Sequence, residues 1–180
     1  MLDVIKNSQI QTKESQVAMA PTADEFYKKN MEKKREDELI QLLSFIVDNE
    51  EYALKLSETM EVIKMRDVTE VPHAPSFISG IISLRGEIIP VISMQKRLGL
   101  KEKDIDLNEN RMIVASHSDI KIGLIVDRIM GVVKVNQNNI ESTSNIQQDA
   151  GGEFIRGVVH HKDRLIILLN LPMLLEMEDV

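Results

Sequence analysis

From about residue 40 onwards, short apolar runs alternate with polar turns every ten residues or so. The runs are rich in valine and isoleucine, and this spacing is typical of an all-β barrel or sandwich. The clearest example is the segment 77–92, FISGIISLRGEIIPVI, in which two apolar runs flank the pair Arg85-Gly86. The pattern predicts a β-hairpin, and we expect Gly86 to take the positive φ that the third residue of a type II turn requires.

The folded part of the sequence repeats itself. Residues 43–64 match residues 113–134 at a constant offset of 70, and residues 77–92 match residues 154–169 at an offset of 77. The seven extra residues fall in the polar stretch 136–153. Two copies of one strand plan, of about 70 residues each, predict two small β-barrels in series.

The repeat also sets the expected domain boundaries. We expect one folded region over residues 39–176, with a first barrel at about 39–92 and a second at about 111–171. A linker helix is expected at about 93–110, and residues 1–38 form an N-terminal extension. Whether the two barrels exchange strands stays open.

Three short helices are predicted outside the strands. In the linker, Met94 and Leu98 have helical spacing and Gly99 is a plausible stop. A second helical turn is expected to begin at Ser57, a favourable N-cap residue. A third is expected near the C-terminal end, opened by Pro172.

The N-terminal extension differs in texture from the rest of the chain. Residues 1–23 are polar and show no period, whereas residues 24–38 carry five basic and six acidic side chains. Acidic residues precede lysines by four positions there, which favours a solvated helix. Its apolar stripe is thin, so a disordered, partly helical tail and a docking segment are both open interpretations.

The repeat separates what the fold needs from what it leaves free. Positions that are identical in both copies are expected to be core anchors or tight backbone approaches: Phe77/Phe154 and Gly80/Gly157. Other positions differ between the copies. Arg85 faces Lys162 and Glu61 faces Gly131, so the fold does not demand a carboxylate at position 61. These two charged residues are therefore candidates for binding.

Composition excludes several classes of function. A net charge of −7 argues against nucleic acid as a partner, because phosphate binding needs concentrated positive charge. The N-terminus has no signal-peptide pattern, and apolar runs such as Leu165–Leu169 are far too short to span a bilayer. With no cysteine, disulfides and thiolate chemistry are excluded. We expect a cytoplasmic protein that does not insert into a membrane.

Catalytic chemistry is not predicted either. The four histidines, His73, His117, His160 and His161, show no metal-ligand spacing, and no phosphate-binding or nucleophile motif is present. An enzyme or small-ligand domain on a barrel scaffold is the competing class, and it would need a polar concave site with perturbed groups. We therefore expect no enzyme, no metal and no cofactor, but a protein-binding adaptor.

Two motifs then carry a resemblance. P-x-F-I-x-G-I-x-x-L-R-G-x-I-I-P-V-I occupies residues 75–92, and V-D-x-I-x-x-V occupies residues 126–132. With them, the chain resembles the CheW family of bacterial chemotaxis coupling proteins over residues 40–175 or so. It departs from the family pattern at Ser83, where asparagine is usual, and at Ser93, where aspartate is common.

The resemblance implies two intertwined five-stranded SH3-like β-barrels and a non-catalytic role in two-component signalling. Such an adaptor bridges the cytoplasmic tips of chemoreceptors and the regulatory domain of the histidine kinase CheA, in arrays at the membrane. A related array with another output, such as pilus motility, is the alternative. The family's receptor-binding groove between the barrels carries over to Arg85, Glu61, Thr59, Gly80 and Val132. Kinase-contacting residues are not assigned.

Overall fold

The computed structural model describes residues 22–37, 39–142 and 152–176. The chain divides into two units, residues 1–37 and 38–180. In the first unit, helix α1 (Ala23–Asp37) begins with a reciprocal capping box. The backbone N–H of Thr22 donates to the Glu25 carboxylate at 2.9 Å, and the Glu25 N–H donates to the Thr22 hydroxyl at 3.3 Å. This cap satisfies two of the N–H groups that a helix leaves free at its start.

Helix α1 is the solvated helix that the charge pattern favours. Its large apolar side chains, Phe26, Tyr27 and Met31, are all more than half exposed. The other expected residues of the extension, 1–21 and 38, lie outside the described residues. No helix in the described part of the chain is both long and apolar enough to cross a membrane.

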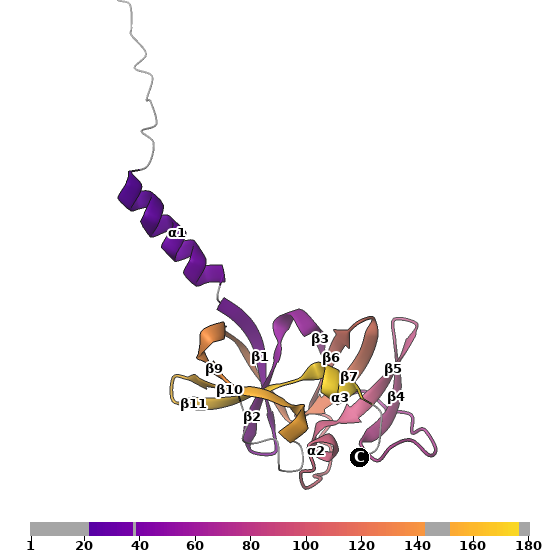
Figure 1. The fold of residues 1–180 in the computed structure, drawn as a ribbon. Helices are drawn as coiled ribbons and strands as arrows, with labels where there is room; N and C mark the ends of the chain where they lie inside the picture. Colours follow the sequence, from indigo (N-terminus) through magenta and orange to yellow (C-terminus); the bar gives the residue numbers. More distant parts are fainter. Residues whose placement is uncertain (1–21, 38, 143–151, 177–180) are drawn as a thin grey trace, which may run out of the picture. The chain divides into compact units, whose positions relative to one another are not determined.

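The second unit consists mainly of strands in two sheets (Figure 1). The six-stranded sheet has the order β8-β1-β2-β11-β10-β9, and the five-stranded sheet has the order β3-β6-β7-β5-β4. The strands are β1 (Leu39–Val47), β2 (Glu50–Lys55), β3 (Thr59–Lys64), β4 (Ile78–Leu84), β5 (Glu87–Ser93), β6 (Arg111–His117), β7 (Ile120–Val126), β8 (Arg128–Asn136), β9 (Ile140–Glu141), β10 (Ile155–His161) and β11 (Arg164–Leu169).

Short helical segments connect the strands: η1 (Leu56–Glu58), α2 (Met94–Arg97), η2 (Gln137–Asn139), η3 (Gly152–Phe154) and α3 (Leu171–Leu175). Two of the three predicted turns are confirmed: α2 ends just before Gly99, whose φ is +67°, and α3 has Pro172 in its first turn. Helix α2 occupies only the first part of the linker 93–110. The third predicted turn is present as η1, but it begins at Leu56 with Lys55 in the cap position, so the prediction that Ser57 caps it was wrong.

The two sheets are the two copies of one arrangement. Under the sequence repeat, β3, β6, β7, β5 and β4 of one sheet correspond in order to β8, β1, β2, β11 and β10 of the other. Each sheet takes strands from both halves of the chain, so the two sheets are intertwined. The all-β fold class is confirmed. The six-stranded sheet differs by the two-residue strand β9, and closure of each sheet into an SH3-like barrel stays a prediction.

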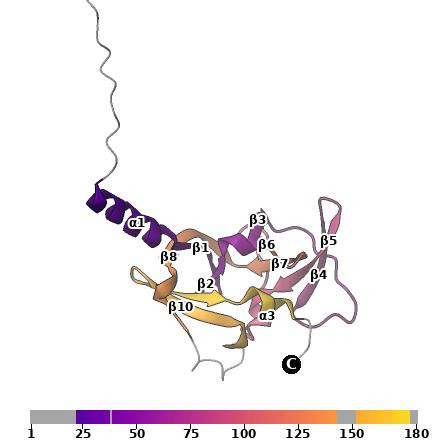
Figure 2. The same ribbon diagram turned by 45° about the horizontal axis from the view of Figure 1, so that its top comes forward.

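The equivalence extends to a bulge in an edge strand of each sheet. In the pairing of β3 with β6, Thr59 faces Ala115 and Glu61 faces Val114, so Met60 is an extra residue. In the pairing of β8 with β1, Met130 is the extra residue in the same way. Figure 2 shows β8 beside β1 and β3 beside β6. Bulges at edges disturb the ladder and hinder unwanted pairing with another chain.

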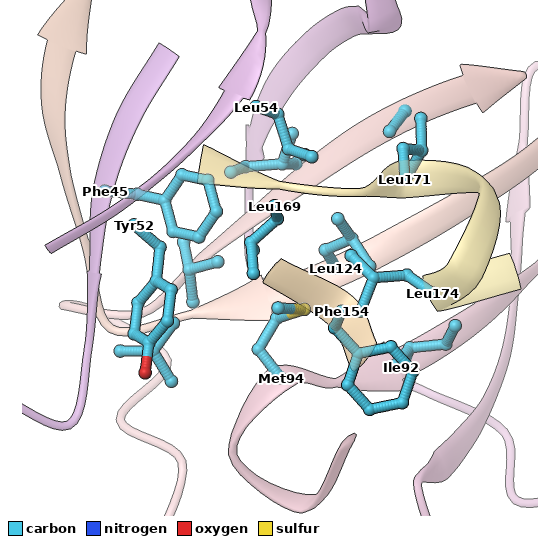
Figure 3. Packing of buried hydrophobic residues seen from close by; sticks show 14 of the residues in the cluster. Phe45, Tyr52, Leu54, Ile92, Met94, Leu124, Phe154, Leu169, Leu171 and Leu174 are labelled. Atoms are coloured by element: carbon cyan, nitrogen blue, oxygen red, sulfur yellow. The ribbon is translucent and has the colours of Figure 1, made fainter. Parts of the chain in front are cut away.

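Buried side chains form three clusters. One lies within the five-stranded sheet, one lies within the six-stranded sheet, and the third, called here the shared core, takes side chains from both. Figure 3 shows the shared core, with Phe45 of β1 and Leu124 of β7 among its members. Phe77 and Phe154 both belong to it, which confirms the expected core anchors. Each fully buried side chain of this size contributes about 1.5–3 kcal/mol.

The guanidinium of Arg97 lies between these two phenylalanines. Its central carbon is 4.0 Å from the ring centre of Phe77 and 4.6 Å from that of Phe154. The same side chain donates hydrogen bonds to the carbonyls of Met173, at 3.2 Å, and Glu176. Arg97 therefore connects α2 to the end of α3, through its stacking on the two matched phenylalanines and its hydrogen bonds to backbone carbonyls.

Candidate functional site

The turn between β4 and β5 presents Arg85 in an uncommon backbone conformation. Leu84 pairs with Glu87, so Arg85 and Gly86 are a two-residue loop, with φ of +53° and +85°. Positive φ at both positions is the signature of a type I′ turn, so the predicted type II turn was wrong. Two-residue hairpins favour type I′ because its twist matches that of the flanking strands.

The side chain of Arg85 is paired with Glu61. The Nη2 atom of Arg85 donates to the Glu61 Oε2 atom at 3.0 Å, from the hairpin tip to edge strand β3. The Arg85 side chain is 77% exposed and the Glu61 side chain 24% exposed. Ion pairs this open to water contribute roughly 0–1 kcal/mol to stability. The pair is therefore available to exchange partners at little cost to the fold.

A second ion pair lies beside the first. Lys121 of β7 contacts Glu87 of β5. Both pairs line a groove of about 220 Å³ at this end of the five-stranded sheet. An adjoining groove of about 570 Å³ shares Glu87, Ile89 and Lys121 with it. The groove thus has an apolar floor and charged side chains of both signs around it. Protein interfaces have the same arrangement, an apolar centre with a polar rim.

The equivalent end of the six-stranded sheet carries different side chains. Under the repeat, Lys121 corresponds to Glu51 and Glu87 corresponds to Arg164, and these two residues form an ion pair at 3.0 Å with the charges reversed. The hydroxyl of Ser44 also donates to the Glu51 carboxylate. The counterpart of Glu61 is Gly131, which has no side chain to pair with a cation.

Thr59 and Gly80 have local structural roles. The hydroxyl of Thr59 donates to the carbonyl of Lys55 at 3.3 Å, at the start of β3. Gly80 is buried with φ of +144°, and a Cβ atom there would lie 2.2 Å from the carbonyl oxygen of Thr69. The matching position, Gly157, would place a Cβ atom 2.7 Å from the carbonyl oxygen of Glu141. The expected tight backbone approach is confirmed at both glycines.

Val132 lies in the other sheet from Arg85 and Glu61. It is on edge strand β8, 51% exposed, directly opposite Leu43 of β1. Opposed residues of paired strands project from the same face, and Leu43 belongs to the shared core. Val132 therefore lies at the edge of the shared core, where the two sheets meet. This border is called the seam below.

Sequence reasoning missed the rest of this apolar border. Val62 of β3 faces Ile113, which also belongs to the shared core, so Val62 borders the same seam from the five-stranded sheet. The bulge residues Met60 and Met130 are exposed as well, and the four side chains are between 40% and 52% exposed. The signal was present in the matched stretches MEVIK and MGVVK, which carry a methionine and a valine at the same two positions in both copies.

The structure thus distributes the expected site over two faces of β3. Glu61 lies opposite Val114, a member of the five-stranded sheet's own cluster, whereas its neighbour Val62 lies on the side of the shared core. Arg85 and Glu61 are in contact, whereas Thr59 lies opposite Ala115 of the shared core and Val132 lies in the other sheet. Gly80 has no side chain to offer a partner, and its role is to allow the close approach of the backbone at Thr69.

Asp127 connects three parts of the second unit. Its carboxylate accepts from the N–H of Asp48 at 2.7 Å, from the side chain of Gln95 at 3.0 Å and from that of Asn110 at 3.4 Å. Lys103 forms a hydrogen-bonded ion pair with the carboxylate of Asp48. The hydrogen bond to Asp48 raises the pKa of Lys103 above its usual value.

The part of the chain that the structure describes contains no candidate metal site. Within residues 22–37, 39–142 and 152–176, no three histidine, aspartate or glutamate side chains are close enough to hold a metal ion. The pKa of Tyr52 is raised, mainly by burial and further by the carboxylates of Glu50 and Asp48. Tyr52 belongs to the shared core, so this shift reflects packing rather than chemistry at a site.

Comparison with known proteins identifies relatives over most of the chain. Residues 41–179 match the family described as a CheW-like domain. The chemotaxis protein CheW of Treponema pallidum is 32% identical over 147 residues, which cover 80% of this chain and 86% of that protein. CheW of Thermotoga maritima is 35% identical over 139 residues, covering 76% of this chain and 87% of that protein.

A solved structure agrees with the fold. The crystal structure of the scaffolding protein TtCheW from Thermoanaerobacter tengcongensis matches with a TM-score of 0.71 and 34% sequence identity. The match covers 76% of this chain and 92% of that protein. The predicted resemblance is therefore confirmed by both sequence and fold.

Proposed function

The chain belongs to the CheW-like family, and from that premise we propose that it couples chemoreceptors to a CheA-type histidine kinase. This is a family of non-catalytic scaffolds associated with chemotaxis, so the chain is not an enzyme. The proposed partners are the cytoplasmic tips of chemoreceptors and the regulatory domain of the kinase. The proposed location is the cytoplasmic face of the membrane, within receptor arrays.

The observation that carries this proposal is the pair of equivalent edge strands with exposed apolar side chains. Val62 on β3 and Val132 on β8 border the seam from opposite sheets, and Met60 and Met130 project from matching bulges. Exposed apolar side chains bordered by charged residues mark protein-binding surfaces. A receptor helix that lies against the seam would bury them in the way that amphipathic helices use apolar grooves.

Arg85 and Glu61 are proposed to complete the receptor contact. The guanidinium is exposed at a hairpin tip and already holds one carboxylate, Glu61, at 3.0 Å. A second carboxylate on a receptor helix can occupy its remaining donors, because the planar guanidinium binds two acceptors in a fixed geometry. Since Glu61 and Val62 project from opposite faces of β3, a receptor that contacts both must wrap around this edge strand.

The proposal is tested by titrating the full chain with a receptor tip and, separately, with a kinase regulatory domain. We expect both to bind. Val132→Lys should weaken receptor binding by about tenfold or more, because the substitution places a charge in an apolar contact. Kinase binding should stay unchanged.

Leu165→Lys is the matched control, since Leu165 is similarly exposed but lies on β11 of the same sheet. It should leave receptor affinity unchanged. Equal effects of Val132→Lys and Leu165→Lys, or an effect of Val132→Lys on the kinase alone, would contradict the assignment of the seam to receptors.

A further inference from the structure

An open groove at one end of the six-stranded sheet contains none of the residues proposed for the receptor contact. Its volume is about 530 Å³. Apolar side chains of Ile40, Leu56 and Ile140 line it together with the cations of Lys55 and Arg156. It is called the Lys55 groove below.

The sequence repeat gives several residues that line this groove a counterpart in the other sheet. Ile40, Lys55 and Ser57 correspond to Asn110, Ile125 and Asp127, and Arg156 corresponds to Ser79. All four of these counterparts line a second groove, in the five-stranded sheet, whose volume is only about 20 Å³. The two grooves therefore occupy the same place in the repeated architecture, but one is open and the other is nearly closed.

The second groove is nearly closed because the linker passes over it. Glu102, Lys103 and Ile105 of the linker line it. The linker is held in place by a hydrogen bond from the N–H of Lys103 to the side-chain oxygen of Gln95, at 2.9 Å, and by Asn110, whose side chain donates to the carbonyl of Val126 at 3.2 Å. An extended segment with an aliphatic residue between charged ones is thus what this place in the fold accommodates.

Charge distinguishes the open groove from its counterpart. Its two charged lining residues are both basic, whereas the corresponding positions in the second groove are Ile125 and Ser79. Among the described residues, neither Lys55 nor Arg156 forms an ion pair. In a chain of net charge −7, two free cations beside an apolar floor favour an anionic ligand.

We propose that the Lys55 groove binds an extended acidic segment of a partner protein. One aliphatic side chain of that segment packs against Ile40, Leu56 and Ile140, and flanking carboxylates pair with Lys55 and Arg156. The contact occupies the place that the linker occupies in the other sheet. It is separate from the seam and from Arg85.

The probe for this proposal comes from the chain itself. A capped, fluorescently labelled peptide of residues 102–109, EKDIDLNE, has four carboxylates, one lysine and the aliphatic residues Ile105 and Leu107. It contains the linker residues that line the second groove. Fluorescence anisotropy with the full chain should show saturable binding that weakens as salt is added, because salt screens exposed charge pairs.

Three variants locate the binding. Lys55→Glu and Arg156→Glu should each weaken binding of the peptide by about tenfold, since each reverses a charge in the groove. Lys64→Glu makes the same charge change on an exposed lysine of β3 outside the groove, and it should leave the affinity unchanged. Thermal unfolding of each variant confirms that it is folded.

A second peptide separates charge from shape. Replacing Glu102, Asp104, Asp106 and Glu109 of the peptide by their amides should abolish most of the binding. The proposal is overturned by absence of saturable binding up to millimolar peptide, by equal binding of the amide peptide, or by equal loss in Lys64→Glu and Lys55→Glu. A failure here is distinguishable from a failure of the proposed function, because the receptor and kinase titrations use other ligands and have their own readouts.

Discussion

The five-stranded and six-stranded sheets have the same strand order but present opposite charges at equivalent ends. Lys121 and Glu87 form the ion pair in one sheet, and Glu51 and Arg164 form it in the other. A partner that approaches from solvent therefore meets a reversed arrangement of charge. The two sheets thus share a backbone plan but differ in the arrangement of charge at this end.

The hairpin tips differ in the same way. Arg85 and Lys162 both have positive φ, +53° and +56°, so the two turns share an uncommon backbone conformation at a basic residue. Only Arg85 has a carboxylate within reach, because the counterpart of Glu61 is Gly131. The fold does not require this difference, and it falls at two positions that contact each other, which is why the pair is proposed as part of a binding surface.

Charge reversal at the two tips should produce the largest difference between the sheets. Arg85→Glu is expected to weaken receptor binding by roughly 30- to 1000-fold, because a central interface arginine contributes about 2–4 kcal/mol. The new carboxylate also repels Glu61. The fold should survive, since an exposed charge change usually costs less than about 0.5 kcal/mol. The measurement is titration of parent and variant against the receptor tip and the kinase domain in parallel.

Lys162→Glu is the matched control for this experiment and should leave receptor affinity unchanged. If Arg85→Glu removed kinase binding and spared the receptor, the hairpin end would belong to the kinase and only the seam to the receptor. The kinase and the receptor would then contact opposite faces of β3, the face of Glu61 and the face of Val62 respectively.

Substitution of the matched glycines Gly80 and Gly157 should have the same effect in both sheets. Gly80→Ala and Gly157→Ala are each expected to lower the free energy of unfolding by about 2–3 kcal/mol, because each Cβ atom would overlap a backbone carbonyl and overpacking has costs of this size. Gly131→Ala is the control: its φ is +126°, but nothing lies within 4 Å of the added Cβ atom. Gly131→Ala should lower the free energy of unfolding only by the strain of placing an alanine at this φ.

Chemical denaturation with constant m-values is the measurement. A Gly80→Ala protein as stable as the parent would mean that the crossing segment at Thr69 moves aside without loss. The tight approach would then not be what Gly80 provides.

The smallest expected effect is a charge exchange within one sheet. The double variant Lys121→Glu, Glu87→Lys gives the five-stranded sheet the same order of charges as the Glu51–Arg164 pair. Its stability should change by less than about 1 kcal/mol, because the exposed pair is reformed with reversed sign. Each single variant should be less stable than the double variant. A double variant less stable than both singles would show that the neighbouring Arg85–Glu61 pair depends on the native polarity.

Much of the fold followed from the sequence because its signals are local. Alternating apolar residues, turn residues and the offsets of 70 and 77 predicted the strands, the linker helix and the helix at Pro172. The motif around Arg85 indicated the family, and the identity of Gly80 and Gly157 indicated a close backbone approach. Glu61 and Arg85 stood out because the repeat did not require them, and the structure places them in contact.

Other features required the tertiary structure. Alternation reports which face of a strand is buried, but not which strand lies beside it. The parallel pairing of β2 with β11, through Tyr52 and Ile167, joins residues more than a hundred positions apart. The type I′ turn at Arg85 depends on the twist of both strands, so Gly86 alone did not reveal it.

The division of the candidate site was also decided in three dimensions. Glu61 and Val62 are adjacent in sequence, yet their cross-strand partners, Val114 and Ile113, belong to different clusters. Only the packing of both sheets shows which face of β3 borders the seam and which faces the sheet's own cluster. The sequence by itself determined the residues and their elements. Their assignment to surfaces came from contacts between distant segments, because hydrophobic burial is collective and carries no local record of the partner.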